Sequence, residues 1–290
     1  MKEIKSRHTS VDLNELLLHA EAVISDDLRI HSPPISPVSI GDLRVGVDLG
    51  TAYSVLVVLD QLGYPIIGEY KFAQVVRDGL VFDFVGAVDL LRDMKRRVET
   101  QLGQPLTHAA TGHPPGIPNA EVQATAHVVE AAGFYCSGVI DEPSAANLVV
   151  DLQEGVIVDV GGGTTGIAII KNGQVVHTAD EATGGTHFSL VIAGALDISF
   201  EEAESLKTDP KQQSRLFPIV RPVMEKVGSI IANNIIGYDV DQITIVGGTV
   251  LFPGFAEVIE EVIGRPTQVV HNPLFVTPIG IAMHDQEKVF

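Results

Sequence analysis

Short runs rich in valine, leucine and isoleucine alternate along this chain with longer segments in which apolar residues recur every three or four positions. The short runs predict strands, and the longer segments predict amphipathic helices. The first half predicts three strands joined by tight turns, then a helix over about 87–102, a strand, a helix over about 119–132 and a last strand. The second half predicts the same three-strand start, followed by helices and two further strands. Its predicted helices cover about 187–197, 199–207 and 217–236, a segment from Gly247 through Gly264, and a last segment from Pro273.

One short phrase occurs at the same place in both halves. Val-Gly-Val-Asp-Leu-Gly-Thr-Ala occupies 45–52, and Ile-Val-Asp-Val-Gly-Gly-Gly-Thr-Thr-Gly occupies 157–166. In each, a strand that carries one aspartate passes through glycines into a second strand, which gives a hairpin whose tip offers backbone N–H groups. Walker and dinucleotide-binding loops pass from strand to helix instead. The pattern predicts an internal duplication in which two hairpins clasp one polyphosphate and its metal.

The two aspartates of these hairpins are candidate metal-binding residues. An ionised carboxylate inside an apolar strand needs a partner, and Asp48 and Asp159 hold equivalent places in the two halves. Two carboxylates beside a metal-bound phosphate suit Mg²⁺, which keeps several of its waters and takes few protein ligands. Asp48 and Asp159 are therefore predicted to hold the ion through water.

Three further features each have two interpretations. Glu142 precedes a proline-initiated helix, where it would either stabilise the first turn through the helix dipole or position an attacking water. Glu204 and Lys207 lie three apart on one predicted helix and could form an ordinary surface pair. Gly247-Gly248 would form a tight turn or let a nucleoside lie against the backbone.

The composition of the chain excludes several classes of binding partner. The formal net charge of −18 repels nucleic acid and disfavours anionic membrane surfaces, and no apolar run approaches the ~18–20 residues of a membrane span. A single cysteine excludes an internal disulfide framework and fits a reducing cytosol. We expect a cytoplasmic protein that binds neither nucleic acid nor membrane.

The first 40 residues differ from the rest of the chain. Ser10 or Asp12 could cap a helix through about Ser25, and the proline-rich segment 31–37 then predicts an extended linker. The apolar face of this helix would either dock on a partner or pack on the protein's own body. The expected organisation is an N-terminal helix and linker over 1–40, a first lobe over 41–153, a second lobe over 154–272 and a C-terminal helix over 273–290 that returns to the first lobe.

Five segments, in order, resemble the superfamily of actin, sugar kinases and seventy-kilodalton heat-shock chaperones. The two hairpin phrases resemble its phosphate motifs, and Asp-Glu-Pro-Ser-Ala-Ala-Asn at 141–147 resembles its first connecting helix. Ile-Val-Gly-Gly-Thr-Val-Leu-Phe-Pro-Gly at 245–254 resembles the adenosine motif, and 272–283 resembles the second connecting helix. The resemblance implies an α/β fold of two duplicated ribonuclease-H-like lobes, with mixed five-stranded sheets around an interlobe cleft for ATP and Mg²⁺.

The same resemblance implies roles for individual residues. Asp48 and Asp159 would hold the waters of the metal, and Glu142 would orient the attacking water. The residues implied to bind phosphate are Gly50, Thr51, Ala52, Gly161, Gly162, Gly163 and Thr164. The residues implied to contact the nucleoside are Glu204, Lys207, Gly247, Gly248 and Thr249.

A narrower resemblance is to the ethanolamine-utilisation J (EutJ) family, a chaperone-like branch of this superfamily. It is carried by segments 76–88, 108–111, 179–187 and 199–207. This resemblance implies a chaperone-like or reactivating accessory protein that acts on a protein partner by nucleotide-dependent lobe closure, with slow ATP hydrolysis left open. The implied partner is the ammonia-lyase or the shell of a bacterial microcompartment.

Three alternatives stay open beside this function: a small-molecule kinase, an actin-like filament former and a nucleotide-sensing scaffold without turnover. The chain also departs from the chaperone pattern at three positions. Leu251 stands where chaperones carry an arginine that stacks on adenine, Leu274 stands where they carry an aspartate, and Gly166 replaces an aspartate just after the second hairpin. The departures at Leu251 and Leu274 fall in the adenosine and second connecting motifs.

Overall fold

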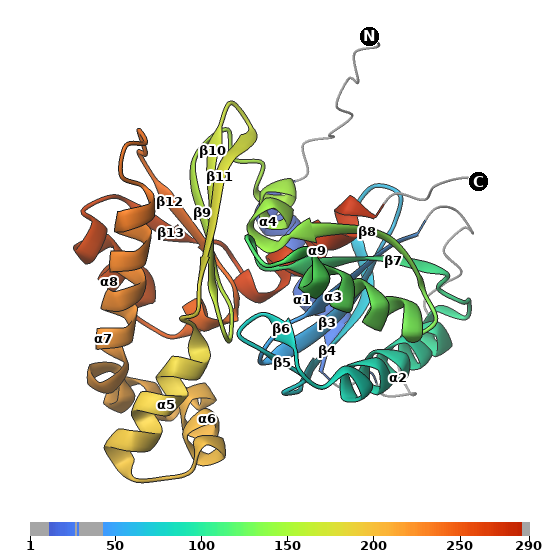
Figure 1. The fold of residues 1–290 in the computed structure, drawn as a ribbon, viewed down its shortest axis with the longest axis horizontal. Coiled ribbons are helices and arrows are strands. Elements are labelled where there is room, and N and C mark those ends of the chain that lie inside the picture. Colours follow the sequence, from blue (N-terminus) through green and yellow to red (C-terminus); the bar gives the residue numbers. More distant parts are fainter. Residues whose placement is uncertain (1–11, 27, 29–42, 286–290) are drawn as a thin grey trace.

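The two repeated phrases form the first hairpins of two separate sheets. The computed structural model describes residues 12–26, 28 and 43–285, and Figure 1 shows the two lobes side by side. Lobe I begins with the antiparallel strands β2 (Arg44–Leu49), β3 (Tyr53–Leu59) and β4 (Pro65–Phe72). Lobe II begins with β9 (Glu154–Val160), β10 (Thr165–Lys171) and β11 (Gln174–Glu181) in the same arrangement.

Parallel strands complete both sheets in the same order. In lobe I, β7 (His108–His113) and β8 (Tyr135–Asp141) extend the sheet beyond β2. In lobe II, β12 (Ile243–Val246) and β13 (Thr267–Val269) extend it beyond β9. The strand orders β4-β3-β2-β7-β8 and β11-β10-β9-β12-β13 are equivalent, which confirms the predicted pair of duplicated α/β lobes with mixed sheets.

Some short strands were not expected from the sequence. The two-residue strand β1 (Ile24–Ser25) pairs in parallel with β4, so the described sheet of lobe I has six strands rather than five. The short strands β5 (Val76–Arg77) and β6 (Leu80–Val81) were also not expected, and they form a hairpin apart from both sheets in the connection between β4 and α2. A strand of two residues is too short to show an alternation of apolar and polar positions, so β1 is recognised only by its pairing with β4.

Helices cover the outer face of each sheet. In lobe I these are α2 (Phe84–Leu102) and α3 (Asn119–Ala131), which bury Val88, Leu91 and Val98 against β2 and β3. In lobe II, α7 (Pro210–Asn234) and α8 (Phe255–Ile263) lie against the sheet. Helices α5 (Gly185–Leu196) and α6 (Phe200–Thr208) pack on α7 and on each other (Figure 1). No helix in the described part of the chain is both long enough and apolar enough to cross a lipid bilayer.

Helix α7 corrects the predicted start near residue 217. It begins at Pro210 and continues through Pro218 and Pro222, although each internal proline costs about 3 kcal/mol in a helix. The compensation is burial: Leu216, Val220, Met224, Val227 and Ile231 form one stripe that packs into the lobe II core. The segment after Gly247 is also different, because a 3₁₀ turn, η1 (Gly248–Leu251), and a loop precede α8.

Two helices connect the lobes and lie between the two sheets (Figure 1). Helix α4 (Glu142–Val150) leads from β8 into β9, and α9 (Val276–His284) follows the 3₁₀ turn η2 (Pro273–Phe275) back to lobe I. Their backbones touch where they cross: a Cβ on Gly280 would lie 1.9 Å from the carbonyl oxygen of Ala145. On its other side α9 also lies close to β2, since a Cβ on Gly46 would lie 2.6 Å from the Ala282 nitrogen. Glycine at these two positions therefore sets how closely the lobes approach.

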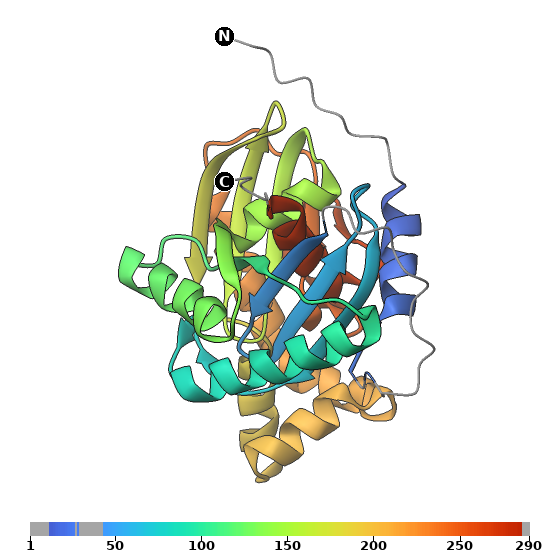
Figure 2. The same ribbon diagram turned by 90° about the vertical axis from the view of Figure 1, so that its right-hand side faces the viewer.

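The N-terminal helix packs on the body of the protein. Asp12 caps α1 (Leu13–Val23) by accepting hydrogen bonds from two backbone amides of its first turn. Its apolar stripe enters the core shared by the two sheets, where it meets Val57, Phe275 and Ile279, and Figure 2 shows the helix beside the strands of lobe I. The apolar face of α1 is thus covered by this chain. Ser10 and the linker 31–37 lie outside the described residues.

Truncating one side chain of α1 tests this packing. Leu17 is fully buried and Leu18 is 54% exposed, although they are neighbours on the same helix. Leu17→Ala leaves a cavity in the shared core, so we expect it to lower the unfolding free energy by about 2–5 kcal/mol, and Leu18→Ala to lower it by less than about 0.5 kcal/mol. Chemical denaturation of the two variants measures both values. Equal effects would mean that the helix does not pack as described.

The helix crossing is tested by adding one methyl group. Gly280→Ala places that group against the Ala145 carbonyl, so we expect a loss of about 1–3 kcal/mol or more, in spite of the better helix propensity of alanine. Gly194→Ala is the matched control, because Gly194 is an exposed position within α5 with nothing within 4 Å of an added Cβ. This control should be neutral or stabilising by up to about 1 kcal/mol. A stabilised Gly280→Ala variant in thermal denaturation would contradict the close crossing.

Candidate functional site

The tips of the two predicted phosphate hairpins meet across the interlobe cleft. Each tip is closed by the same backbone hydrogen bond: Gly50 N–H donates to the Tyr53 carbonyl over 3.1 Å, and Gly161 N–H donates to the Thr164 carbonyl over 3.0 Å. The approach of the tips depends on glycine, since a Cβ on Gly162 would lie 2.8 Å from the Ala52 Cβ. The duplication therefore extends to the hydrogen bond that closes each turn.

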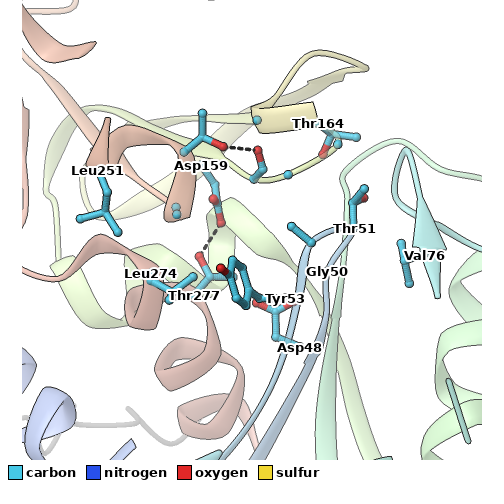
Figure 3. A pocket seen from close by; sticks show the side chains of 18 of the residues that line it. Asp48, Gly50, Thr51, Tyr53, Val76, Asp159, Thr164, Leu251, Leu274 and Thr277 are labelled. Atoms are coloured by element: carbon cyan, nitrogen blue, oxygen red, sulfur yellow. Dashed lines mark hydrogen bonds between the residues drawn. The ribbon is translucent and has the colours of Figure 1, made fainter. Parts of the chain in front are cut away.

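A cavity of about 350 Å³ opens beside the two tips (Figure 3). It brings together, from both lobes, every residue that the sequence predicts for the site. These are Asp48, Gly50, Thr51, Ala52, Glu142, Asp159, Gly161, Gly162, Gly163, Thr164, Glu204, Lys207, Gly247, Gly248 and Thr249.

Three of these residues are carboxylic acids held close together and out of solvent. Burial, and then the charge of Asp159, raises the pKa of Asp48 to about 7. Burial raises the pKa of Asp159 to about 6, although a hydrogen bond from Thr277 lowers it in part. Burial and the charges of Asp48, Asp159 and Asp180 raise the pKa of Glu142 well above its usual range. Among the described residues, the charged groups that act on Asp48 and Glu142 are all negative, so the cluster is suited to receive a cation.

Asp159 is held in place from two directions. The Thr277 hydroxyl at the start of α9 donates a hydrogen bond of 2.5 Å to Asp159 Oδ2, drawn as a dashed line in Figure 3. On the other side, a Cβ on Gly247 would lie 2.4 Å from Asp159 Oδ1, and Gly247 has the positive φ of 95° that glycine adopts freely. The C-terminal connecting helix thus fixes the carboxylate of the lobe II hairpin.

The far end of the cavity is formed by lobe II. Lys207 donates to Glu204 over 2.7 Å and to the Gly185 carbonyl over 3.1 Å, and burial lowers its pKa while Glu204 raises it. The pair is therefore a largely buried part of the cavity wall rather than an exposed surface pair. Thr249 Oγ1 donates to the Gly161 carbonyl over 2.7 Å, which ties η1 to the hairpin.

The sequence did not single out four residues of the site. Tyr53 and Thr277 line the cavity, Phe252 adds an apolar wall, and Asp180 stands beside the acid cluster. Tyr53 directly follows Ala52 in the first hairpin phrase, and this position in the sequence is enough to predict that it lies near the site. Asp180 and Thr277 reach the cluster only through strand pairing and helix packing. Leu251 and Leu274, noted as departures from the chaperone pattern, lie together at the end of the cavity away from Thr51 (Figure 3).

The residues present fit a metal-bound polyphosphate. Glycine-rich turns from both lobes offer backbone N–H groups without side chains in the way, and buried carboxylates stand at their bases. The described residues contain no group of three or more side chains that could hold a metal ion directly. Contact through the waters of a Mg²⁺ ion is therefore the arrangement that suits these carboxylates.

The fold and the cavity between its lobes define a protein of the actin-like ATPase class. Family models agree: cell division protein FtsA matches residues 156–280, and the MreB/Mbl protein matches residues 67–201. The crystal structure of MreB5 of Spiroplasma citri bound to ADP superposes with a TM-score of 0.69 at 18% identity, covering 84% of this chain and 96% of that one. At that identity the likeness shows the fold alone.

Within this class, the chain belongs to the family of the ethanolamine utilization protein EutJ. It is 43% identical to EutJ of Escherichia coli (strain K12) over 249 residues, which are 85% of this chain and 87% of that protein. The crystal structure of EutJ from Carboxydothermus hydrogenoformans superposes with a TM-score of 0.85 at 43% identity, covering 94% of this chain and 99% of that one. A chaperone protein HscA homolog of Pseudomonas aeruginosa (strain LESB58) is 33% identical over 152 residues, 49% of this chain and 24% of that chaperone.

The acid cluster predicts a pH-dependent stability in the absence of nucleotide and Mg²⁺. A carboxyl whose pKa is higher in the folded state than in the unfolded chain binds its proton more tightly when folded. Below about pH 4, the pKa in the unfolded chain, the Asp48 carboxyl is protonated in both states and does not change the stability. Above about pH 7, its pKa in the folded protein, the carboxyl is ionised in both states and its full destabilising effect is present. The unfolding free energy should therefore fall as the pH rises from 4 to 7.

Asp48→Asn removes part of this penalty. We expect the variant to melt several degrees above the parent protein at pH 8 and close to it at pH 4, by thermal denaturation without ligand. Asp239→Asn is the control, because Asp239 is exposed and should change neither value. A lower melting temperature for Asp48→Asn at pH 8 would contradict the electrostatic account.

Proposed function

We propose that this chain is an ATP- and Mg²⁺-binding accessory protein of ethanolamine utilisation that acts on a protein partner through nucleotide-dependent closure of its two lobes. One observation carries the proposal. Equivalent hairpins from two duplicated lobes present backbone N–H groups to the same cavity, beside buried carboxylates with raised pKa values. Membership of the EutJ family supports the metabolic context, and the actin-like ATPase fold supports the nucleotide.

In this proposal the hairpin tips bind the phosphates. The backbone amides of Thr51 and Ala52 and of Gly162–Thr164 donate to phosphate oxygens from opposite sides of the cleft, while the Gly50 and Gly161 amides close the two turns. Asp48 and Asp159 accept hydrogen bonds from the waters of the metal. When bound, Mg²⁺ supplies positive charge that offsets both the phosphates and the acid cluster.

Glu142 is placed to hold a water against the terminal phosphate. Asp141 caps α4 by accepting a hydrogen bond from Ser144 N–H, and Pro143 fits the first turn, so Glu142 stands at the end of the helix with its side chain in the cavity. Its raised pKa suits a group that exchanges a proton with water. The nucleoside lies toward Glu204, Lys207 and the glycines 247–248, with Leu251 and Leu274 against the base.

Lobe closure follows from where the ligand contacts lie. Phosphate contacts on both hairpins favour the state in which the tips are close, so nucleotide binding shifts the population toward the closed form. The exposed surfaces of the lobes then change their relative positions, which is how a partner would sense the nucleotide. Membership of the EutJ family supports a partner within ethanolamine utilisation, and the ammonia-lyase and the microcompartment shell are the partners we propose.

A second candidate, a nucleotide-sensing scaffold without turnover, is favoured by one observation. Lys207 is the only lysine or arginine among the described residues that line the cavity, and it is held by Glu204 and the Gly185 carbonyl of lobe II. No cationic side chain of the described lining therefore stands free to stabilise a transferring phosphoryl group. Measuring phosphate release from a saturated complex separates the two candidates.

Calorimetric titration of ATP tests the shared core of both candidates. We expect ATP to bind with Mg²⁺ present and to bind at least about tenfold more weakly with EDTA, because the bare polyphosphate meets an acidic cavity. Asp48→Ala and Asp159→Ala should each weaken the Mg²⁺-dependent binding by about 10–100-fold.

Asp239→Ala, on the exposed surface of lobe II, provides the matched control and should bind as the parent protein does. Circular dichroism of each variant ensures that lost binding is not lost folding. If neither aspartate in the cavity matters for ATP binding, the hairpins do not form a Mg²⁺–phosphate site and the proposal is wrong.

A further inference from the structure

Asp180 lies in a row of three residues that runs across the lobe II sheet. In the antiparallel pairing, Gly166 of β10 stands opposite Asp159 of β9 on one side and opposite Asp180 of β11 on the other. Residues directly opposite one another point to the same face of a sheet, so the two aspartates flank a position that has no side chain. That face is the one on which the acid cluster lies.

The empty place over Gly166 is filled from lobe I and α4. A Cβ on Gly166 would lie 3.3 Å from Pro143 Cδ and 3.6 Å from Pro115 Cδ. Pro143 packs on Gly166 and directly follows Glu142, so Glu142 lies close to the row formed by Asp159, Gly166 and Asp180. The charges of Asp159 and Asp180 both act on Glu142 there. Gly166 thus makes room for the first turn of α4 between two carboxylates.

The carboxylate of Asp180 is incompletely satisfied. Its Oδ1 atom is buried and has no hydrogen-bond partner within the described ranges of the chain. The Thr164 hydroxyl at the hairpin tip hydrogen-bonds to the same carboxylate group. The other groups that act on it, Asp159 and Glu181, are negative. A buried acceptor without a donor destabilises the folded state, more so when it is charged, so a ligand that donates to Asp180 would remove this penalty.

We propose that Asp180 is a further residue of the nucleotide site and accepts a hydrogen bond from the hydrated Mg²⁺ ion that arrives with the nucleotide. This inference rests on the proposed function, because it assigns one more residue to the same cation. Thr164 links Asp180 to the tip that contacts phosphate, and the charges of Asp180 and Asp159 both act on Glu142. Since the described carboxylates form no direct metal cluster, Asp180 reaches the ion through water.

Two measurements on Asp180→Asn test the assignment. Without ligand, the variant should melt at or above the temperature of the parent protein, because an unpaired charge has been removed while the size and the contact with Thr164 are kept. In calorimetry, the ratio of ATP affinities with Mg²⁺ and with EDTA should fall by about 10–100-fold, the usual effect of removing a group that holds a metal ligand in place. Glu181→Gln is the control, because Glu181 is the exposed next residue of the same strand.

The outcomes separate this inference from the proposed function. A lower melting temperature together with an unchanged affinity ratio would show that Asp180 is structural and would overturn the inference. An unchanged ratio in Asp180→Asn but a reduced one in Asp159→Ala would overturn the role of Asp180 and leave the Mg²⁺–ATP site standing. If the parent protein shows no Mg²⁺-dependent binding of ATP, both fail.

Discussion

The close crossing of the two connecting helices is the constraint on which the rest of the structure depends. Gly280 lets α9 press its backbone against Ala145 of α4, so the two helices behave as one central layer between the sheets. Each helix also begins in the cavity, α4 with Glu142 and α9 close to Thr277. The crossing therefore fixes the distance between the lobes and, at the same time, the positions of two groups that meet the acid cluster.

The site at these helix ends contains groups that are energetically unfavourable in the absence of a ligand. Burial, and then neighbouring carboxylates, raise the pKa of Asp48 and of Glu142, and Asp180 keeps an oxygen without a donor among the described residues. Folded proteins accept such unfavourable groups where binding will satisfy them. In a chain with a net charge of −18, backbone amides and glycine turns supply a local attraction for anions that side chains do not.

The sequence located the site better than it located the elements around it. The hairpin phrases specify their own geometry, because glycine placement and strand alternation are local, and every residue predicted from them lines the cavity. Helix α7 was placed too late because tertiary burial of Leu216 and Val220 outweighs the local signal of two prolines. The sequence does not predict Asp180 as a site residue, because its position depends on the pairing of β11 with β10 opposite Gly166, and no local pattern indicates that pairing. The amphipathic stripe of α1 was evident, but an apolar face does not say which surface it covers.

The position of α1 has a mechanical consequence. This helix fills the core between the sheets and reaches the loop before η2, where Glu21 pairs with His271 over 3.2 Å. Under the proposed lobe closure α1 would lie near the axis of rotation, where the displacement of one lobe relative to the other is smallest. The turn at Asn172–Gly173 lies at the far end of the lobe II hairpin, where the same rotation produces a large displacement. If the lobes close as proposed, anything attached near α1 would move little, and a partner bound near the turn at Asn172–Gly173 would be displaced most.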